Sequence, residues 1–158
     1  MKNLVRIFMF AFATLIHSVA WAAYGDELGR FNGVTVYSNQ GHLDDGQYQC
    51  VEYVRRYYNQ TYDIDLKSMY LGNANKWISN ATSMNLTGYS NNSSSNVRPE
   101  IGDILTSAAS PNGHVAIVSS VTDSQVCVAQ QNFDNDANDG DGTHCMSMSW
   151  NSSTGYSV

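Results

Sequence analysis

The chain has 158 residues, with 14 acidic against 8 basic side chains and a formal net charge of −6. Nucleic acids bind a basic face, and anionic membranes attract basic proteins. Because this chain is acidic, we expect neither as a partner. Its length is that of one ordinary domain, which can build a core without a scaffold of disulfides.

The N-terminal residues have the pattern of a secretory signal peptide. Lys2 and Arg6 precede an apolar run over residues 7–16, and small residues follow in Ala20-Trp21-Ala22. We therefore expect residues 1–22 to be a signal peptide cleaved after Ala22, with cleavage after Ala20 as the alternative. The run is shorter than the roughly 20 residues of a membrane span; an uncleaved anchor is the competing interpretation.

Cleavage would leave residues 23–158 as a single domain without a stable membrane span. The removal of two cations would change the formal charge from −6 to about −8. We expect this domain to be a monomer in the periplasm or outside the cell. Because net charge would not attract an anionic cell-wall polymer, such a polymer would have to be held by local contacts.

The first half of the mature chain has one clear helical pattern. Residues 23–33 read as a loop or a short helix, and Val34–Tyr37 as a short strand. A helix is expected from Cys50 to about Tyr58, because apolar side chains recur there with helical spacing. A second helix is expected near residues 73–79, and the polar residues 79–96 read as a long surface loop.

The second half reads as strands. Residues 101–105, 115–121, 126–130 and 145–150 are rich in apolar or β-branched side chains, and the second and third of these runs look like a hairpin. The sum is an α+β domain in which N-terminal helices precede a central antiparallel sheet.

The three cysteines make an odd count for an exported chain. Cys127 and Cys145 lie in two apolar runs, and if these are neighbouring strands the two sulfurs could pair in an oxidising compartment. The alternative is that both are unpaired, buried thiols. Cys50 is then the thiol left over.

Cys50 and His114 together fit nucleophilic catalysis. Cys50 is at the start of the expected helix, where unpaired N–H groups and the helix dipole stabilise a thiolate. His114 opens an apolar strand after a glycine, so it is our choice for the base that takes the thiol proton. His42 is a reserve candidate, and His144 reads as a surface residue.

The remaining roles fall on amide side chains. Gln130 and Asn132 share a face of the strand expected to pair with that of His114, so either could orient the imidazole. The Cys50 N–H is one donor for an oxyanion, and Gln47 or Gln49 could supply a second. Each of these residues also has a purely structural interpretation.

Four ordered blocks resemble the CHAP family of cysteine, histidine-dependent amidohydrolases and peptidases. They are Gly46–Tyr53, Gly102–Leu105, Gly113–Val118 and the preceding Asn32–Ser38, so that the resemblance covers roughly residues 30–150. It implies a papain-like α+β fold, related to the NlpC/P60 enzymes, with Cys50 as nucleophile and His114 as base. It also implies hydrolysis of amide bonds in peptidoglycan peptides without a cofactor, although one branch of the family cleaves glutathionylspermidine.

One departure from the family leaves an alternative open. The family often shows Glu-Gln-Asn where this chain has Gln130-Gln131-Asn132, so an amide replaces the acidic residue. Either Asn132 orients His114 or activity is reduced. The second hypothesis is therefore a catalytically weak or inactive module that binds cell-wall peptide or a partner protein.

Acidic residues cluster in two places where a metal could be considered. Asp44 and Asp45 precede the cysteine, and four aspartates crowd one later loop (Asp134, Asp136, Asp139 and Asp141). Some relatives bind calcium, but the later loop does not match the EF-hand pattern. We expect a solvated acidic loop and no metal.

Overall fold

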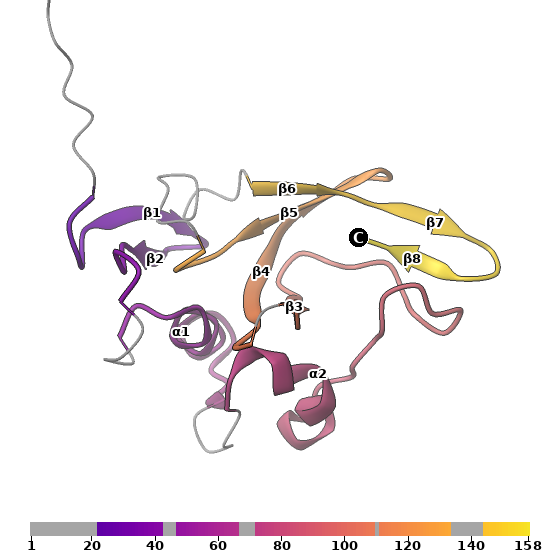
Figure 1. The fold of residues 1–158 in the computed structure, drawn as a ribbon, viewed down its shortest axis with the longest axis horizontal. Helices are drawn as coiled ribbons and strands as arrows, with labels where there is room; N and C mark the ends of the chain where they lie inside the picture. The colour runs from indigo at the N-terminus through magenta and orange to yellow at the C-terminus, as the bar shows by residue number, and fades with distance from the viewer. Residues whose placement is uncertain (1–21, 43–46, 67–71, 110, 134–143) are drawn as a thin grey trace, which may run out of the picture.

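The computed structural model describes residues 22–42, 47–66, 72–109, 111–133 and 144–158, and Figure 1 shows their arrangement. A four-stranded antiparallel sheet lies at the centre, in the order β3-β4-β5-β6. Its strands are β3 (Ile104–Ser107), β4 (His114–Val121), β5 (Gln125–Ala129) and β6 (His144–Ser147). The α+β class expected from the sequence is therefore confirmed.

Helix α1 (Cys50–Tyr62) packs against one face of this sheet. It begins after Gln49, whose backbone is extended, and ends at Asp63, whose φ of 57° is left-handed. Its buried side chains are Tyr53, Val54, Tyr57 and Tyr58, a stripe at helical spacing. The helix expected from Cys50 is present and runs one turn beyond residue 58.

The two faces of the central sheet alternate along β4. Val115 and Ile117 belong to the core cluster with the α1 tyrosines, whereas Ala116 and Val118 line a cavity on the other face. Strands β4 and β5 form the expected hairpin, with a register shift between Val118 and Ser120. The core thus joins α1 to the strand that begins at His114.

The prediction of N-terminal helices is not supported. The described chain instead starts with a β-hairpin, β1 (Glu27–Phe31) and β2 (Val34–Tyr37), so residues 23–33 are not a helix. Asn32 and Gly33 form its tight turn, both with positive φ, as such turns require. Val34 and Val36 are buried beside the aromatic stripe of α1, which explains why this segment pairs as strands.

The segment after α1 folds into successive short turns. They are η2 (Ala74–Lys76), α2 (Trp77–Asn80) and η3 (Ala81–Met84), so the helix expected near residues 73–79 is present only in short pieces. Trp77 is 2% exposed and anchors these turns to the core. The loop expected over residues 79–96 is therefore only partly a loop: α2 and η3 occupy it as far as Met84, and residues 86–97 follow without a helix or strand.

The strand expected over residues 145–150 is divided in two. β6 ends at Ser147, and the chain continues as β7 (Ser149–Asn151), which pairs with β8 (Gly155–Ser157). Figure 1 shows the β7–β8 hairpin extending beyond the central sheet, with β8 returning to the C-terminus. β8 has no counterpart among the strands expected from the sequence.

A disulfide joins Cys127 on β5 to Cys145 on β6, which are directly opposed in the register. It ties β6, the edge strand of the sheet, to its neighbour. Cys50 is the remaining free cysteine.

The expected signal peptide lies outside the described residues, apart from Ala22. The two aspartates before Cys50 and the acidic loop at 134–141 also lie outside them. Among the described residues, no helix has the length and apolar character needed to cross a membrane.

Candidate active site

Cys50 is the first residue of α1 and is partly buried. Burial raises the pKa of its thiol above the ordinary value, and hydrogen bonds from the backbone of Val115, Val51 and Cys50 itself oppose this rise. The helix start therefore solvates the sulfur only in part. At neutral pH Cys50 is a thiol, and attack on a carbonyl requires a base to take its proton.

His114 is the first residue of β4. The glycine before it is required, because Gly113 has a φ of +71° and a Cβ there would collide with the backbone of Asn75 and Ser107. The β-strand and this close backbone contact fix the backbone position of His114. The backbone of Val115, the next residue, hydrogen-bonds Cys50, so the structure brings the thiol to the start of the strand that carries His114.

Gln130 is the residue that contacts the imidazole. Its Oε1 lies 3.1 Å from His114 Nε2, and the side chain is buried beyond the end of β5. A carbonyl oxygen can only accept, so His114 Nε2 carries the proton and Nδ1 is the basic nitrogen of the neutral ring. This is the tautomer in which Nδ1 can take a proton from a thiol.

Asn132 has a different contact. It adopts a left-handed φ of 57°, and its Nδ2 donates to Gln49 Oε1 over 2.7 Å. The strand ends at Ala129, so the shared parity of Gln130 and Asn132 does not place both side chains on His114. Between the two residues considered for orienting the imidazole, the structure brings Gln130 to it.

Gln49 and Gln47 lie on the chain just before the nucleophile. The side-chain Nε2 of Gln49 donates to the backbone carbonyl oxygen of His42 over 2.7 Å. This hydrogen bond joins the Gln49 side chain to the preceding loop. Gln47 is exposed, and its carbonyl oxygen accepts from Asn39 Nδ2 over 3.0 Å. His42 is exposed and its ring packs on Tyr24, with centroids 4.8 Å apart.

Gln131 is a residue of the site to which the sequence analysis assigned no role. Its side chain is fully buried and makes four hydrogen bonds. Oε1 accepts from the Tyr37 N–H and from Arg56, and Nε2 donates to the Gln49 carbonyl and to Glu52, all over 2.9–3.2 Å. It therefore joins β2, α1 and the residue before Cys50. Only its place between Gln130 and Asn132 could have drawn attention to it.

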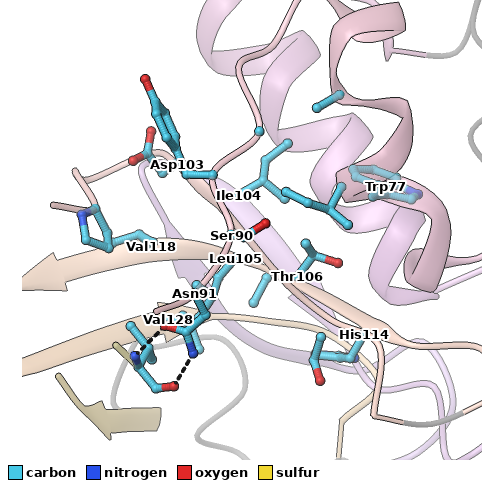
Figure 2. Close-up of a pocket in the computed structure, with 18 of the residues that line it drawn as sticks. Trp77, Ser90, Asn91, Asp103, Ile104, Leu105, Thr106, His114, Val118 and Val128 are labelled. Carbon is cyan, nitrogen blue, oxygen red and sulfur yellow. Dashed lines mark hydrogen bonds between the residues drawn. The ribbon is translucent and has the colours of Figure 1, made fainter. Parts of the chain in front are cut away.

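A cavity of about 960 Å³ borders the histidine side of the site. His114 and Gln130 line it, whereas Cys50 does not. Figure 2 shows His114, Thr106 and Trp77 at one end of this cavity. Phe133 and His144 also line it, and the Phe133 ring lies between the two histidines, with centroids 5.2 Å from His114 and 5.1 Å from His144.

The sequence context of His144 suggested a surface residue, but the structure places this residue at the cavity. It is half-buried at the start of β6, paired with Val128, and its ring is directed to the cavity with Phe133. The sequence could not place it there because the pairing of β5 with β6 was needed. Among the described residues, no group of three or more His, Cys, Asp or Glu side chains could hold a metal ion.

Comparison with protein families identifies the class to which this site belongs. The family model for the CHAP domain matches residues 37–132, a span that contains Cys50, His114 and Gln130. The chain therefore belongs to the CHAP domain family, whose members are generally amidase- or peptidase-type hydrolases of peptidoglycan. A comparison with curated proteins gave no match.

Proposed function

We propose that this protein is an exported cysteine amidohydrolase or endopeptidase that hydrolyses amide bonds in peptidoglycan peptides. The observation that carries the proposal is the connected series Cys50, the start of β4, His114 and Gln130. A thiol on a helix start, a histidine that begins the strand whose backbone hydrogen-bonds this thiol, and an amide on the histidine ring are the three parts of a papain-like site.

In the proposed reaction the Cys50 sulfur attacks the amide carbon while His114 Nδ1 takes the thiol proton. The oxyanion accepts hydrogen bonds from the Cys50 N–H and from Gln47 or Gln49. Collapse of the intermediate breaks the C–N bond, and His114 returns its proton to the leaving amine. Water, deprotonated by His114, then cleaves the thioester to give the acid and the free thiol.

The raised pKa of Cys50 bears on the order of these steps. A thiol made less acidic by burial is not stored as a thiolate, so proton transfer to His114 accompanies the attack. The contact with Gln130 supports this, because it selects the tautomer whose Nδ1 is unprotonated.

Three further parts of the proposal concern the whole chain. Residues 1–22 act as a signal peptide, residues 23–158 form one monomeric catalytic domain, and the enzyme works in the periplasm or outside the cell. The Cys127–Cys145 disulfide supports an oxidising location, because such bonds persist mainly there.

The test is release of free amino groups from purified peptidoglycan. We expect Cys50→Ala and His114→Ala each to reduce the rate by at least about a thousandfold, because the nucleophile and the base act together and neither works without the other. His42→Ala is the matched control, because this histidine is exposed and its ring packs on Tyr24. Full activity in Cys50→Ala would contradict the proposal.

A catalytically weak or inactive module that binds wall peptide is the second candidate. It is favoured by two observations, the raised pKa of Cys50 and the amide at position 130. Alkylation by iodoacetamide at pH 7 separates the two. An enzyme loses labelling rate in His114→Ala, because its thiol needs that base, whereas an inert module labels at the same slow rate in both proteins.

A further inference from the structure

Tyr48, two residues before Cys50, has a backbone conformation that its side chain disfavours. Its φ is 51°, in the left-handed region, where a Cβ crowds the backbone. Seven described residues other than glycine have a positive φ, and five of these are asparagine or aspartate, the types that tolerate it best. Tyr48 is the aromatic residue among them. A bulky side chain persists in this region only where its surroundings hold it there.

Two aromatic rings and one glycine hold the Tyr48 side chain. The rings of Tyr24 and Tyr37 pack on it, with centroids 5.0 and 5.1 Å away. Gly25 lies against the same ring, since a Cβ at this glycine would be 3.3 Å from the Tyr48 hydroxyl oxygen. Aromatic pairs at such distances attract one another beyond the area that they bury. The segment before β1 and the end of β2 therefore fix the ring of Tyr48.

The peptide groups on both sides of Tyr48 are held by buried amide side chains. Asn39 Nδ2 donates to the Gln47 carbonyl oxygen over 3.0 Å. Gln131 Nε2 donates to the Gln49 carbonyl oxygen over 3.1 Å. Asn39 and Gln131 are both fully buried, so these two hydrogen bonds are shielded from water. The left-handed turn at Tyr48 is the connection between two fixed points of the chain.

The turn at Tyr48 determines how α1 begins. The Gln49 carbonyl oxygen accepts the Tyr53 N–H over 3.0 Å, so the orientation of the Gln49 peptide directs the first turn of the helix. Cys50 is the first residue of this turn, and its sulfur is hydrogen-bonded by the backbone of Cys50 and Val51. A different φ at Tyr48 would rotate the Gln49 peptide and would displace both the sulfur and the Cys50 N–H.

We propose that Tyr48 is a positioning residue for Cys50 and acts through its left-handed backbone. The rings of Tyr24 and Tyr37 hold that backbone conformation, and the Gln49 peptide transmits it to the start of α1. Tyr48 places the sulfur that attacks and the N–H that binds the oxyanion. The words attack and oxyanion rest on the proposed function, whereas the placement of the sulfur does not.

Three substitutions of Tyr48 separate its ring from its backbone. Tyr48→Ala removes the ring contacts and keeps a Cβ, so the turn relaxes; kcat on solubilised peptidoglycan should fall at least about tenfold, with KM changed by less than about twofold. Tyr48→Gly also lacks the ring, but glycine adopts a positive φ freely, so kcat should stay within about threefold of the parent value. Tyr48→Phe keeps the ring contacts and should retain the parent kcat. Asn92→Ala, at an exposed left-handed position in residues 86–97, is the matched control and should leave kcat unchanged.

The pH profile of Cys50 alkylation by iodoacetamide is a second measurement, which a merely structural role would not change. Backbone hydrogen bonds to the sulfur lower the pKa of the thiol, so a displaced sulfur should have a higher pKa. We expect the midpoint of the alkylation profile to rise by about half a pH unit or more in Tyr48→Ala and to stay at the parent value in Tyr48→Gly. If Tyr48→Ala does not fold, Tyr24→Ala removes one of the supporting rings and should change kcat and the midpoint in the same directions.

Two results overturn the inference. One is a kcat and an alkylation midpoint in Tyr48→Ala, or in Tyr24→Ala in its place, that equal those of the parent protein. The other is a Tyr48→Gly protein as impaired as Tyr48→Ala, since the ring rather than the left-handed backbone would then be what matters. Failure of the proposed function looks different, because the parent protein itself would release no amino groups from peptidoglycan. The alkylation midpoints would still decide whether Tyr48 places the sulfur.

Discussion

Replacing Gln131 by methionine tests whether one buried amide holds the active site together. The substitution keeps the length of the side chain and removes all four of its hydrogen bonds. The Tyr37 N–H loses its acceptor, which costs about 1–3 kcal/mol for a buried group. Gln49 keeps a second bond from the Tyr53 N–H, so the loss at its carbonyl is smaller, about 1 kcal/mol.

The charged partners add less. Glu52 and Arg56 are partly exposed and remain paired with each other at 2.7 Å, so each loses a few tenths of a kcal/mol. The total for Gln131→Met is about 3 kcal/mol of unfolding free energy. For a domain of this size that corresponds to a fall in Tm of about 10 °C.

Urea unfolding followed by circular dichroism measures this difference directly. Gln125→Met is the matched control, because Gln125 is exposed on the same segment of chain and should change stability by less than about 0.5 kcal/mol. A loss below about 1 kcal/mol in Gln131→Met would refute the reasoning. It would mean that the four contacts do not support the junction of β2, α1 and Gln49.

Two further predictions concern the disulfide and the buried tyrosines. The double variant Cys127→Ser/Cys145→Ser removes a cross-link between residues separated by 18 positions and should lower the unfolding free energy by about 3 kcal/mol; an unchanged urea midpoint contradicts this. Burial raises the pKa of Tyr57 to about 12 and also raises those of Tyr53 and Tyr58. Because these folded-state pKa values exceed the unfolded value near 10, the stability they contribute is full below about pH 10 and is lost as pH rises toward 12. Urea midpoints between pH 8 and pH 11.5 should therefore fall above pH 10, and a flat profile would show that the three phenols ionise equally well in the folded protein.

The sequence was sufficient for the residues whose position depends on local pattern. The helix at Cys50 and the strand at His114 follow from periodicity and from the glycine before the histidine, and both are present. In the first hairpin, β2 coincides with the strand predicted at Val34–Tyr37, whereas β1 was not predicted, because it depends on pairing with β2 rather than on its own composition. The β7–β8 pair is similarly short and depends on contacts between distant residues, such as Asn96 with the backbone of Tyr156.

The active site could be predicted only in part, because several of its residues also depend on contacts between distant segments of the chain. Gln130 and Asn132 were equivalent as long as the strand was taken to continue through both, and the end of β5 at Ala129 separates them. Gln131, Phe133 and His144 acquire their roles through side chains on other elements, which no spacing along the chain reveals.

The order of apolar and polar residues, the glycine at 113 and the odd number of cysteines are properties of the chain itself, and they indicate the fold class and the candidate nucleophile and base. Only the tertiary structure decides which amide meets the imidazole, that burial raises the pKa of the thiol, and which side chains line the cavity. Those properties depend on distances between residues far apart in sequence and on the exclusion of water, and both arise only when the sheet, α1 and the segment 86–97 are packed together.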